Sequence, residues 1–180
     1  MKITLKNLVG HYSTITRHRH RVIAHCKKAG ILYQGLFHDL SKYLPAEFLA
    51  GVRYYANGTK SPNEKEREIF GYSSAWLHHK GRNKHHFEYW CDYSPETKKM
   101  SPVKMPARYL KELICDRVAA SKIYQGENYC DKHPLEYFMK GMQNRFIHQE
   151  TSDKIQELLT ILAEQGEEEL FRVLRALKNY

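Results

Sequence analysis

The sequence predicts an all-α protein that folds as one domain of about seven or eight helices. Apolar residues recur at spacings of three and four along most of the chain, which is the repeat of one face of a helix. Capping patterns such as Ser61-Pro62-Asn63-Glu64, and glycines such as Gly166, separate these runs. No stretch reads as a strand, and no linker or internal repeat divides the 180 residues, a length that suits one domain with its own core.

The N-terminal half predicts four helices after a short lead-in over Met1–Leu8 and Gly10. The first covers residues 15–29 and ends at Gly30, and a tight turn leads to an antiparallel second helix over residues 31–42. The third begins at Pro45 and ends at Asn57-Gly58, and the fourth runs from Pro62 to Lys80. The inward stripes are Ile15, His18, Val22, His25 or Cys26, and Ala29 in the first helix, Phe48, Leu49, Val52 and Tyr55 in the third, and Ile69, Tyr72, Trp76 and His79 in the fourth, whereas His20 faces outward.

The C-terminal half begins with residues 94–105, which are rich in lysine and proline and predict an exposed loop. Pro106 opens a helix through about Tyr124, and His133-Pro134 begins another. Leucine stripes over residues 152–164 and 167–179 predict a helical hairpin about Gly166 that forms ordinary core. The predicted apolar faces are Tyr109, Leu113, Ala120 and Ile123 in the helix after Pro106, with Asp116 among them, and Leu135, Phe138, Met139, Met142 and Phe146 in the next.

The composition narrows the functional classes. The net charge of +9 and the pI near 9.3 indicate an anionic partner, which could be a phosphorylated small molecule, a nucleic acid or an anionic membrane. The four cysteines show neither zinc-ribbon nor disulfide spacing, and no segment has the length of a membrane span or the apolar core of a signal peptide. We therefore expect a soluble, cytoplasmic protein that does not enter a membrane.

The pair His38-Asp39 ends an apolar run and predicts a metal site. A buried charged carboxylate is costly unless it is paired or bound to a cation. Other inward polar positions are His79, Asp116 and either His18 or His25, which the helical spacing does not separate. Histidine and carboxylate side chains are ligands suited to iron, manganese, zinc or nickel. The alternatives are that Asp39 caps the next segment and that Asp116 pairs with an inward lysine or arginine.

These motifs resemble the HD-domain superfamily of metal-dependent phosphohydrolases, which has a His on one helix, an adjacent His-Asp on the next and a distant Asp. The matching segments are His18-Arg19-His20-Arg21-Val22, His38-Asp39-Leu40-Ser41-Lys42 and Ile114-Cys115-Asp116-Arg117-Val118. The resemblance favours His18 over His25. The run from about His18 to Gln125 also resembles a set of small bacterial and phage proteins that offers no activity to transfer, and its shared motifs include His78-His79 and Asn83-Lys84-His85-His86.

The resemblance implies an HD-domain-like helical bundle, with a metal-site core at about residues 11–125 on which the helices of residues 134–180 pack. It implies a metal-dependent phosphohydrolase that cleaves a phosphomonoester or phosphodiester, such as a nucleotide. One or two divalent ions (Fe, Mn, Zn, Ni, Co or Mg) would be held by His18, His38, Asp39, His79 and Asp116. Catalytic candidates are His85 and His86, as ligands of a second ion or as proton donors, and Lys42 and Arg82, as clamps on the phosphate.

Two other functions fit the sequence. The first is a non-catalytic basic module that binds nucleic acid through lysine and arginine interleaved with tyrosine and tryptophan. The second is a di-iron oxygenase, because a mixed histidine and carboxylate site can also hold two irons. A salt-dependent affinity for mixed DNA or RNA that survives His38→Ala would favour the first. Metal analysis and spectra of the aerobically purified protein separate the second from a phosphohydrolase.

Overall fold

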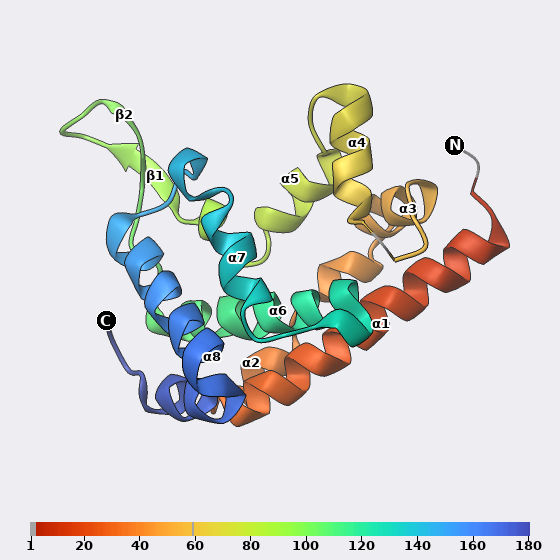
Figure 1. Ribbon diagram of the computed structural model, residues 1–180. Coiled ribbons are helices and arrows are strands. Elements are labelled where there is room, and N and C mark those ends of the chain that lie inside the picture. Colours follow the sequence, from red (N-terminus) through yellow and green to blue (C-terminus); the bar gives the residue numbers. More distant parts are fainter. Residues whose placement is uncertain (1–2, 59) are drawn as a thin grey trace.

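The computed structural model describes residues 3–58 and 60–180, so Met1 and Lys2 of the predicted lead-in lie outside the described residues. Within these ranges the chain forms eight α-helices and one two-stranded hairpin, which confirms the all-α class (Figure 1). The helices are α1 (Leu5–Lys28), α2 (Leu32–Leu36), α3 (Pro45–Arg53), α4 (Pro62–Phe70), α5 (Ser74–Lys80), α6 (Ala107–Gln125), α7 (His133–Met139) and α8 (Gln149–Ala176). Short 3-10 turns η1 (Leu40–Tyr43), η2 (Phe87–Tyr89), η3 (Gly126–Asn128) and η4 (Met142–Asn144) link them.

The hydrophobic core lies where α1, α6 and α8 pack together, with α7 against α8. Both predicted leucine stripes of α8 point into it, and Gly166 bends the helix at a positive φ of 83°, as the predicted hairpin requires. Helices α3, α4 and α5 sit outside this core, with α3 packed on α1 and both α4 and α5 packed on α3 (Figure 1). The fully buried core side chains include Val22, Cys26, Leu110, Ile114, Val118, Phe138, Ile155, Leu158, Leu159, Leu162, Leu170 and Leu174.

Helix α1 begins ten residues before the predicted start. Thr4 caps it by accepting a hydrogen bond from the backbone N–H of Asn7 at 3.2 Å. Gly10 lies inside this helix, and the ring of Tyr55 packs so closely against it that an added Cβ would lie 2.5 Å from Tyr55 Cε1. The predicted lead-in is therefore wrong. The glycine marks a close approach between two segments and not a helix end.

The predicted helix over residues 31–42 is also wrong, because α2 ends at Leu36 and the chain turns before η1. Asp39 sits in this turn with a left-handed φ of 52°. Arg19 of α1 donates its guanidinium N–H groups to the carbonyls of Leu36 and, at 3.2 Å, of His38. These carbonyls lose their helical partners where α2 ends, so Arg19 stabilises the turn that presents His38 and Asp39.

Gly35 allows α2 to approach α1, and we expect Gly35→Ala to destabilise the protein. A Cβ at this position would lie 2.5 Å from Cys26 Cβ, which is too close to the α1 backbone for a rotamer change to relieve. Overpacking of this kind costs about 1–3 kcal/mol. Urea denaturation should show a lower midpoint with an unchanged slope, and an unchanged midpoint would contradict this packing.

The predicted helix from Pro62 to Lys80 is two helices, α4 and α5, separated by Gly71 at a positive φ of 78°. Ser73 caps α5 by accepting from the N–H of Trp76 at 3.0 Å. Buried Glu66 of α4 accepts hydrogen bonds from Ser73 Oγ at 2.5 Å and Ser74 Oγ at 2.7 Å, and so fixes α5 against α4. The predicted stripe breaks at this point, since Ile69 and Tyr72 are exposed whereas His79 is buried.

Helix α3 ends at Arg53 and not at Asn57-Gly58, and Leu49 on its predicted apolar face is exposed. Its buried face instead contains a carboxylate, Glu47.

Three further differences concern the C-terminal half. Residues 94–105, predicted as a loop, contribute to an antiparallel hairpin of β1 (Cys91–Ser94) and β2 (Lys99–Pro102), which extends away from the helices in Figure 1. Met105 at the end of this segment is fully buried. Helix α7 stops at Met139, and Met139 and Phe146 are exposed. The predicted helix from Pro106 to Tyr124 is confirmed as α6, within a residue at each end.

In the described part of the chain, no helix combines the length and the apolar character that crossing a membrane requires.

Candidate metal centre

Five segments deliver histidine and carboxylate side chains to one place. His18 comes from α1, the pair His38 and Asp39 from the turn after α2, and His79 from α5. The adjacent residues His85 and His86 come from the loop between α5 and η2, and Asp116 from α6. Their ligand atoms form two groups, in each of which the atoms lie within 4.8 Å of one another. We call His18, His38, Asp39 and Asp116 the first group, and Asp39, His79, His85 and His86 the second group.

The first group has the spacing of a coordination sphere. His18 Nε2 lies 2.9 Å from Asp116 Oδ1, and His38 Nε2 lies 3.2 Å from Asp39 Oδ2 and 3.7 Å from Asp116 Oδ1. Bonds of about 2.1 Å to one ion place neighbouring ligand atoms roughly 3.0–3.4 Å apart. The observed separations therefore suit a cation between these side chains.

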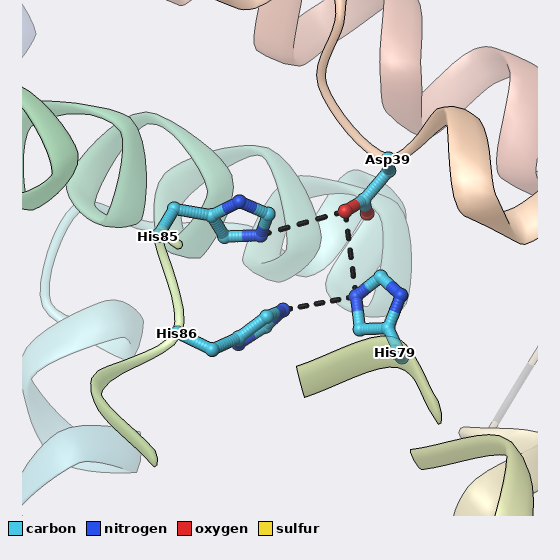
Figure 2. Close-up of side chains that lie close together, drawn as sticks. All are labelled: Asp39, His79, His85 and His86. Atoms are coloured by element: carbon cyan, nitrogen blue, oxygen red, sulfur yellow. Dashed lines mark hydrogen bonds and ion pairs between the residues drawn. The ribbon is translucent and has the colours of Figure 1, made fainter. Parts of the chain in front are cut away.

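The second group surrounds the other oxygen of Asp39 (Figure 2). Asp39 Oδ1 lies 3.3 Å from His79 Nε2 and 3.4 Å from His85 Nε2, and His79 Nε2 lies 2.9 Å from His86 Nε2. His85 and His86 both face the centre although they are neighbours in sequence, because the loop that carries them has no helical or strand periodicity. Asp39 thus belongs to both groups and offers one oxygen to each.

Several buried atoms at the centre lack a hydrogen bond. Within the described residues no hydrogen bond of good geometry reaches His18 Nε2, His38 Nε2, His85 Nε2 or either carboxylate oxygen of Asp39, although Lys42 forms an ion pair with Asp39 Oδ2. Buried polar atoms are otherwise almost always satisfied, so five unsatisfied atoms in one place require an explanation. A bound cation would satisfy all of them, and the residues present fit a metal ion.

Two further carboxylates orient the histidines from outside. Glu112 Oε1 lies 2.8 Å from His38 Nδ1 and 3.2 Å from His85 Nδ1, and Glu47 Oε2 lies 2.7 Å from His79 Nδ1. A carboxylate only accepts, so each of these Nδ1 atoms carries a proton, and each Nε2, where it carries none, can offer its lone pair to a cation. This carboxylate–histidine arrangement is typical of metal sites.

Neither Glu112 nor Glu47 stands out in the sequence. The only signal for Glu112 is its position four residues before Asp116, on the same face of α6. Glu47 looks like an ordinary acidic residue in the first turn of a helix, where the macrodipole favours one.

The pKa values show a centre that attracts positive charge. Burial acts to lower the pKa of His38, but the neighbouring carboxylates outweigh it and raise the pKa to about 10. Burial likewise opposes ionisation of Asp39 and Asp116, yet the surrounding histidines hold the pKa of both carboxyls well below the usual range. Burial lowers the pKa of His18 and of His86, which keeps both in the neutral form that binds metals.

The structure shows which of the histidines left undecided by the helical spacing belong to the centre. His18 belongs to the first group, whereas His25 Nδ1 lies 3.1 Å from the carbonyl of Cys115 and its ring packs on Phe171. His78 lies at the edge and donates to Glu47 at 2.7 Å. His20 is exposed, as predicted.

The two predicted phosphate clamps differ in position. Lys42 Nζ lies 2.6 Å from Asp39 Oδ2 at the centre. Arg82 is exposed and donates to the carbonyl of His78 at 3.4 Å, so it stays outside the site. Asp116 has His18 as its nearest partner, and not the lysine or arginine of the alternative interpretation.

A cavity of 300 Å³ opens beside the centre. His18, His79, His86, Asp116 and Lys42 line it on the side of the two groups. Further along, the lining includes Glu88, Arg117, Arg145 and the aromatic residues Trp76, Phe87, Tyr124 and Tyr137. A small molecule in this cavity would contact the ligand groups directly.

Fold and site together define an all-helical protein with a buried histidine and carboxylate centre that could hold metal ions. The chain matches DUF5662, a family of unknown function, over residues 8–161, and it therefore belongs to that family. The matched range contains every residue of both ligand groups. No curated protein and no solved structure matches the chain.

Proposed function

We propose that this protein is a metal-dependent phosphohydrolase with a centre of two divalent ions. The observation that carries the proposal is the placement of Asp39 between two ligand groups, beside a cavity with cationic side chains. Three histidine Nε2 atoms of these groups, those of His18, His38 and His85, lack a hydrogen bond of good geometry. Ions in these positions would polarise a phosphoryl oxygen and make water a better nucleophile.

The first ion would be held by His18, His38, Asp39 and Asp116, and the second by Asp39, His79, His85 and His86. We thus assign His85 and His86 to metal binding and not to proton transfer, because both rings lie against the second group. Lys42 lines the cavity as a cation next to Asp39, and it would hold the charge of a bound phosphate. We make no such assignment for Arg82.

The resemblance to the HD-domain superfamily supports the same proposal. His18, His38-Asp39 and Asp116 occupy the positions of its motif, and they converge in space although as many as 98 positions separate residues 18 and 116. We propose membership of this superfamily on that basis.

Elemental analysis and phosphatase assays test the proposal together. Protein purified without chelator should contain more than about one transition-metal ion per chain. It should hydrolyse p-nitrophenyl phosphate or bis-p-nitrophenyl phosphate, lose this activity in EDTA, and regain it with Mn²⁺, Co²⁺, Ni²⁺ or Zn²⁺. Protein without bound metal and without metal-stimulated hydrolysis would overturn the proposal.

The same sample tests the other functions. Two irons per chain with oxygen consumption and no phosphate release would replace the phosphohydrolase with an oxygenase. Salt-dependent binding of mixed DNA or RNA that survives His38→Ala, in protein without hydrolytic activity, would favour the nucleic-acid module.

A further inference from the structure

We infer that the substrate carries a second anionic group, phosphate or carboxylate, which Arg117 and Arg145 bind in the cavity beside the metal centre. This inference rests on the proposed function and adds a substrate class to it. The ligand would be a small phosphate ester with two separate negative charges.

The two arginines reach the cavity from different elements. Arg117 follows Asp116 in α6, and Arg145 follows η4 after α7. Both line the cavity that His18, His86 and Asp116 also line. Gly141 allows Arg145 this position, since a Cβ on Gly141 would lie 3.0 Å from Arg145 Nη2.

Neither arginine is neutralised by a carboxylate. Among residues 3–58 and 60–180, no aspartate or glutamate forms an ion pair with Arg117 or Arg145, whereas Lys42 in the same cavity is paired with Asp39. The guanidinium groups rest on aromatic rings instead, Arg117 at 4.9 Å from the Tyr137 ring and Arg145 at 4.5 Å from the Phe138 ring. Guanidinium groups stacked in this way keep N–H groups in the plane for a phosphate or carboxylate.

The two positive charges lie near each other. Burial and, after it, the charge of Arg117 lower the pKa of Arg145, which indicates like charges held close together. Such an arrangement costs free energy in the absence of an anion, and an anion bound between the two groups would remove that cost.

Glu88 adds a second feature to this part of the cavity. Its Oε2 atom is buried and, within the described residues, makes no hydrogen bond. Glu88 is also a cavity residue, and its charge acts on Arg145 more weakly than that of Arg117. One carboxylate beside two guanidinium groups leaves a net positive charge, and the free oxygen would accept a hydrogen bond from a hydroxyl or amino group of the ligand.

The size of the cavity restricts the ligand to a small molecule. A volume of 300 Å³ lies at the lower end of the range of about 300–1,000 Å³ for small-molecule sites. Side chains of the first and second groups line the same cavity as the two arginines, so one substrate molecule can contact the metal centre and the arginines together. The second anionic group therefore belongs to the hydrolysed substrate itself.

Matched substrate pairs test this inference on the metal-loaded protein. The first pair, AMP and adenosine 3′,5′-bisphosphate, differs by a phosphate, and the second pair, glycerol 3-phosphate and 3-phosphoglycerate, differs by a carboxylate. We expect kcat/KM to be about 10- to 100-fold higher for the doubly anionic member of at least one pair. The pair that shows the preference identifies the anionic group.

Arg117→Gln should reduce this preference to about one, mainly through a higher KM for the doubly anionic member. Arg108→Gln is the matched control, because Arg108 also lies in α6 and stacks on a tyrosine, at 4.5 Å from the Tyr109 ring, but is exposed outside the cavity. At Arg145 the variant to use is Arg145→Lys and not a glutamine variant, because Arg145 also donates to the carbonyls of Tyr137 and Phe138. Lysine keeps the positive charge but loses the planar guanidinium group.

The inference would be overturned if neither pair showed the preference, or if the preference persisted in Arg117→Gln. Hydrolysis of the singly anionic members would still support the proposed function in that case. If no substrate is hydrolysed, the proposed function fails and binding decides the inference. In that case adenosine 3′,5′-bisphosphate should raise the melting temperature of metal-free wild type more than AMP does, and Arg117→Gln should abolish the difference. Equal shifts for the two nucleotides would then overturn it.

Discussion

Asp39→Asn should remove both metal ions from the protein. Asp39 is 2% exposed, and its two oxygens face different ligand groups, so one substitution weakens both at once. An amide carries no charge and binds a divalent ion far more weakly than a carboxylate does. We expect the affinity for both ions to fall by more than about 100-fold. This exceeds the loss of about 10- to 100-fold that is typical when a residue hydrogen-bonded to a metal ligand is replaced. Hydrolysis should fall to background.

Asparagine is the right replacement because Asp39 has a left-handed φ of 52°. Asparagine adopts this conformation readily, whereas alanine would add backbone strain and confuse a lost ligand with a damaged turn. Elemental analysis and circular dichroism of the same sample separate the two effects.

The control for this variant is Asp153→Asn, an exposed aspartate at the start of α8 that accepts a hydrogen bond from Gln149. It should retain the metal content of wild type. If Asp39→Asn keeps two ions per chain, Asp39 does not join the two groups and the centre has a different composition.

The helical fold was predictable because its signals are local. The leucine stripes of α8, the run after Pro106 and the bend at Gly166 all follow from residue spacing within one segment. The points where a predicted helix is interrupted were less visible in the sequence, because they depend on contacts between segments. The chain turns at His38 since Arg19 satisfies the freed carbonyls, and α4 ends before α5 since Glu66 holds Ser73 and Ser74.

The candidate site was predictable to the extent that its residues violate the pattern of their own helix. Asp116 stands where an apolar residue is expected, and His79 falls on a stripe predicted to face inward, so both are visible in the sequence. Glu47 and Glu112 were hidden, because a glutamate in a helix is ordinary and only the fold turns these two inward. Helical spacing left the choice between His18 and His25 open, and only the family resemblance favoured His18. The position of α6 gives the physical reason, because Asp116 faces His18 and the Cys115 carbonyl faces His25.

Glu112→Gln should weaken both metal sites, whereas Glu47→Gln should weaken only the second. Glu112 orients His38 of the first group and His85 of the second, and Glu47 orients His79 alone among the ligands. Burial opposes the charge of Glu112, but hydrogen bonds from the two histidines lower its pKa to about 2, so it acts as a charged acceptor at neutral pH.

Glutamine cannot replace Glu112 or Glu47, because every hydrogen-bond partner named here for these two carboxylates is a donor. Glu112 accepts from His38, His85 and Gln34, and Glu47 accepts from His78 and His79. The NH₂ group of a glutamine would face one of these donors, and the affected histidine would rotate or change its tautomer. We expect each affected site to lose affinity by about 10- to 100-fold.

Titration of metal-free protein against a competing chelator measures the two sites separately. Glu66→Gln is the matched control, since Glu66 is 6% exposed and fully hydrogen-bonded but contacts no ligand of either group. Its loss should lower stability and leave both affinities unchanged. If Glu66→Gln weakens metal binding as much as Glu112→Gln does, the effect comes from general destabilisation and not from the orientation of His38 and His85. A selective loss at one site in Glu47→Gln and at both in Glu112→Gln would support two separate ions, with Glu112 orienting one histidine of each group.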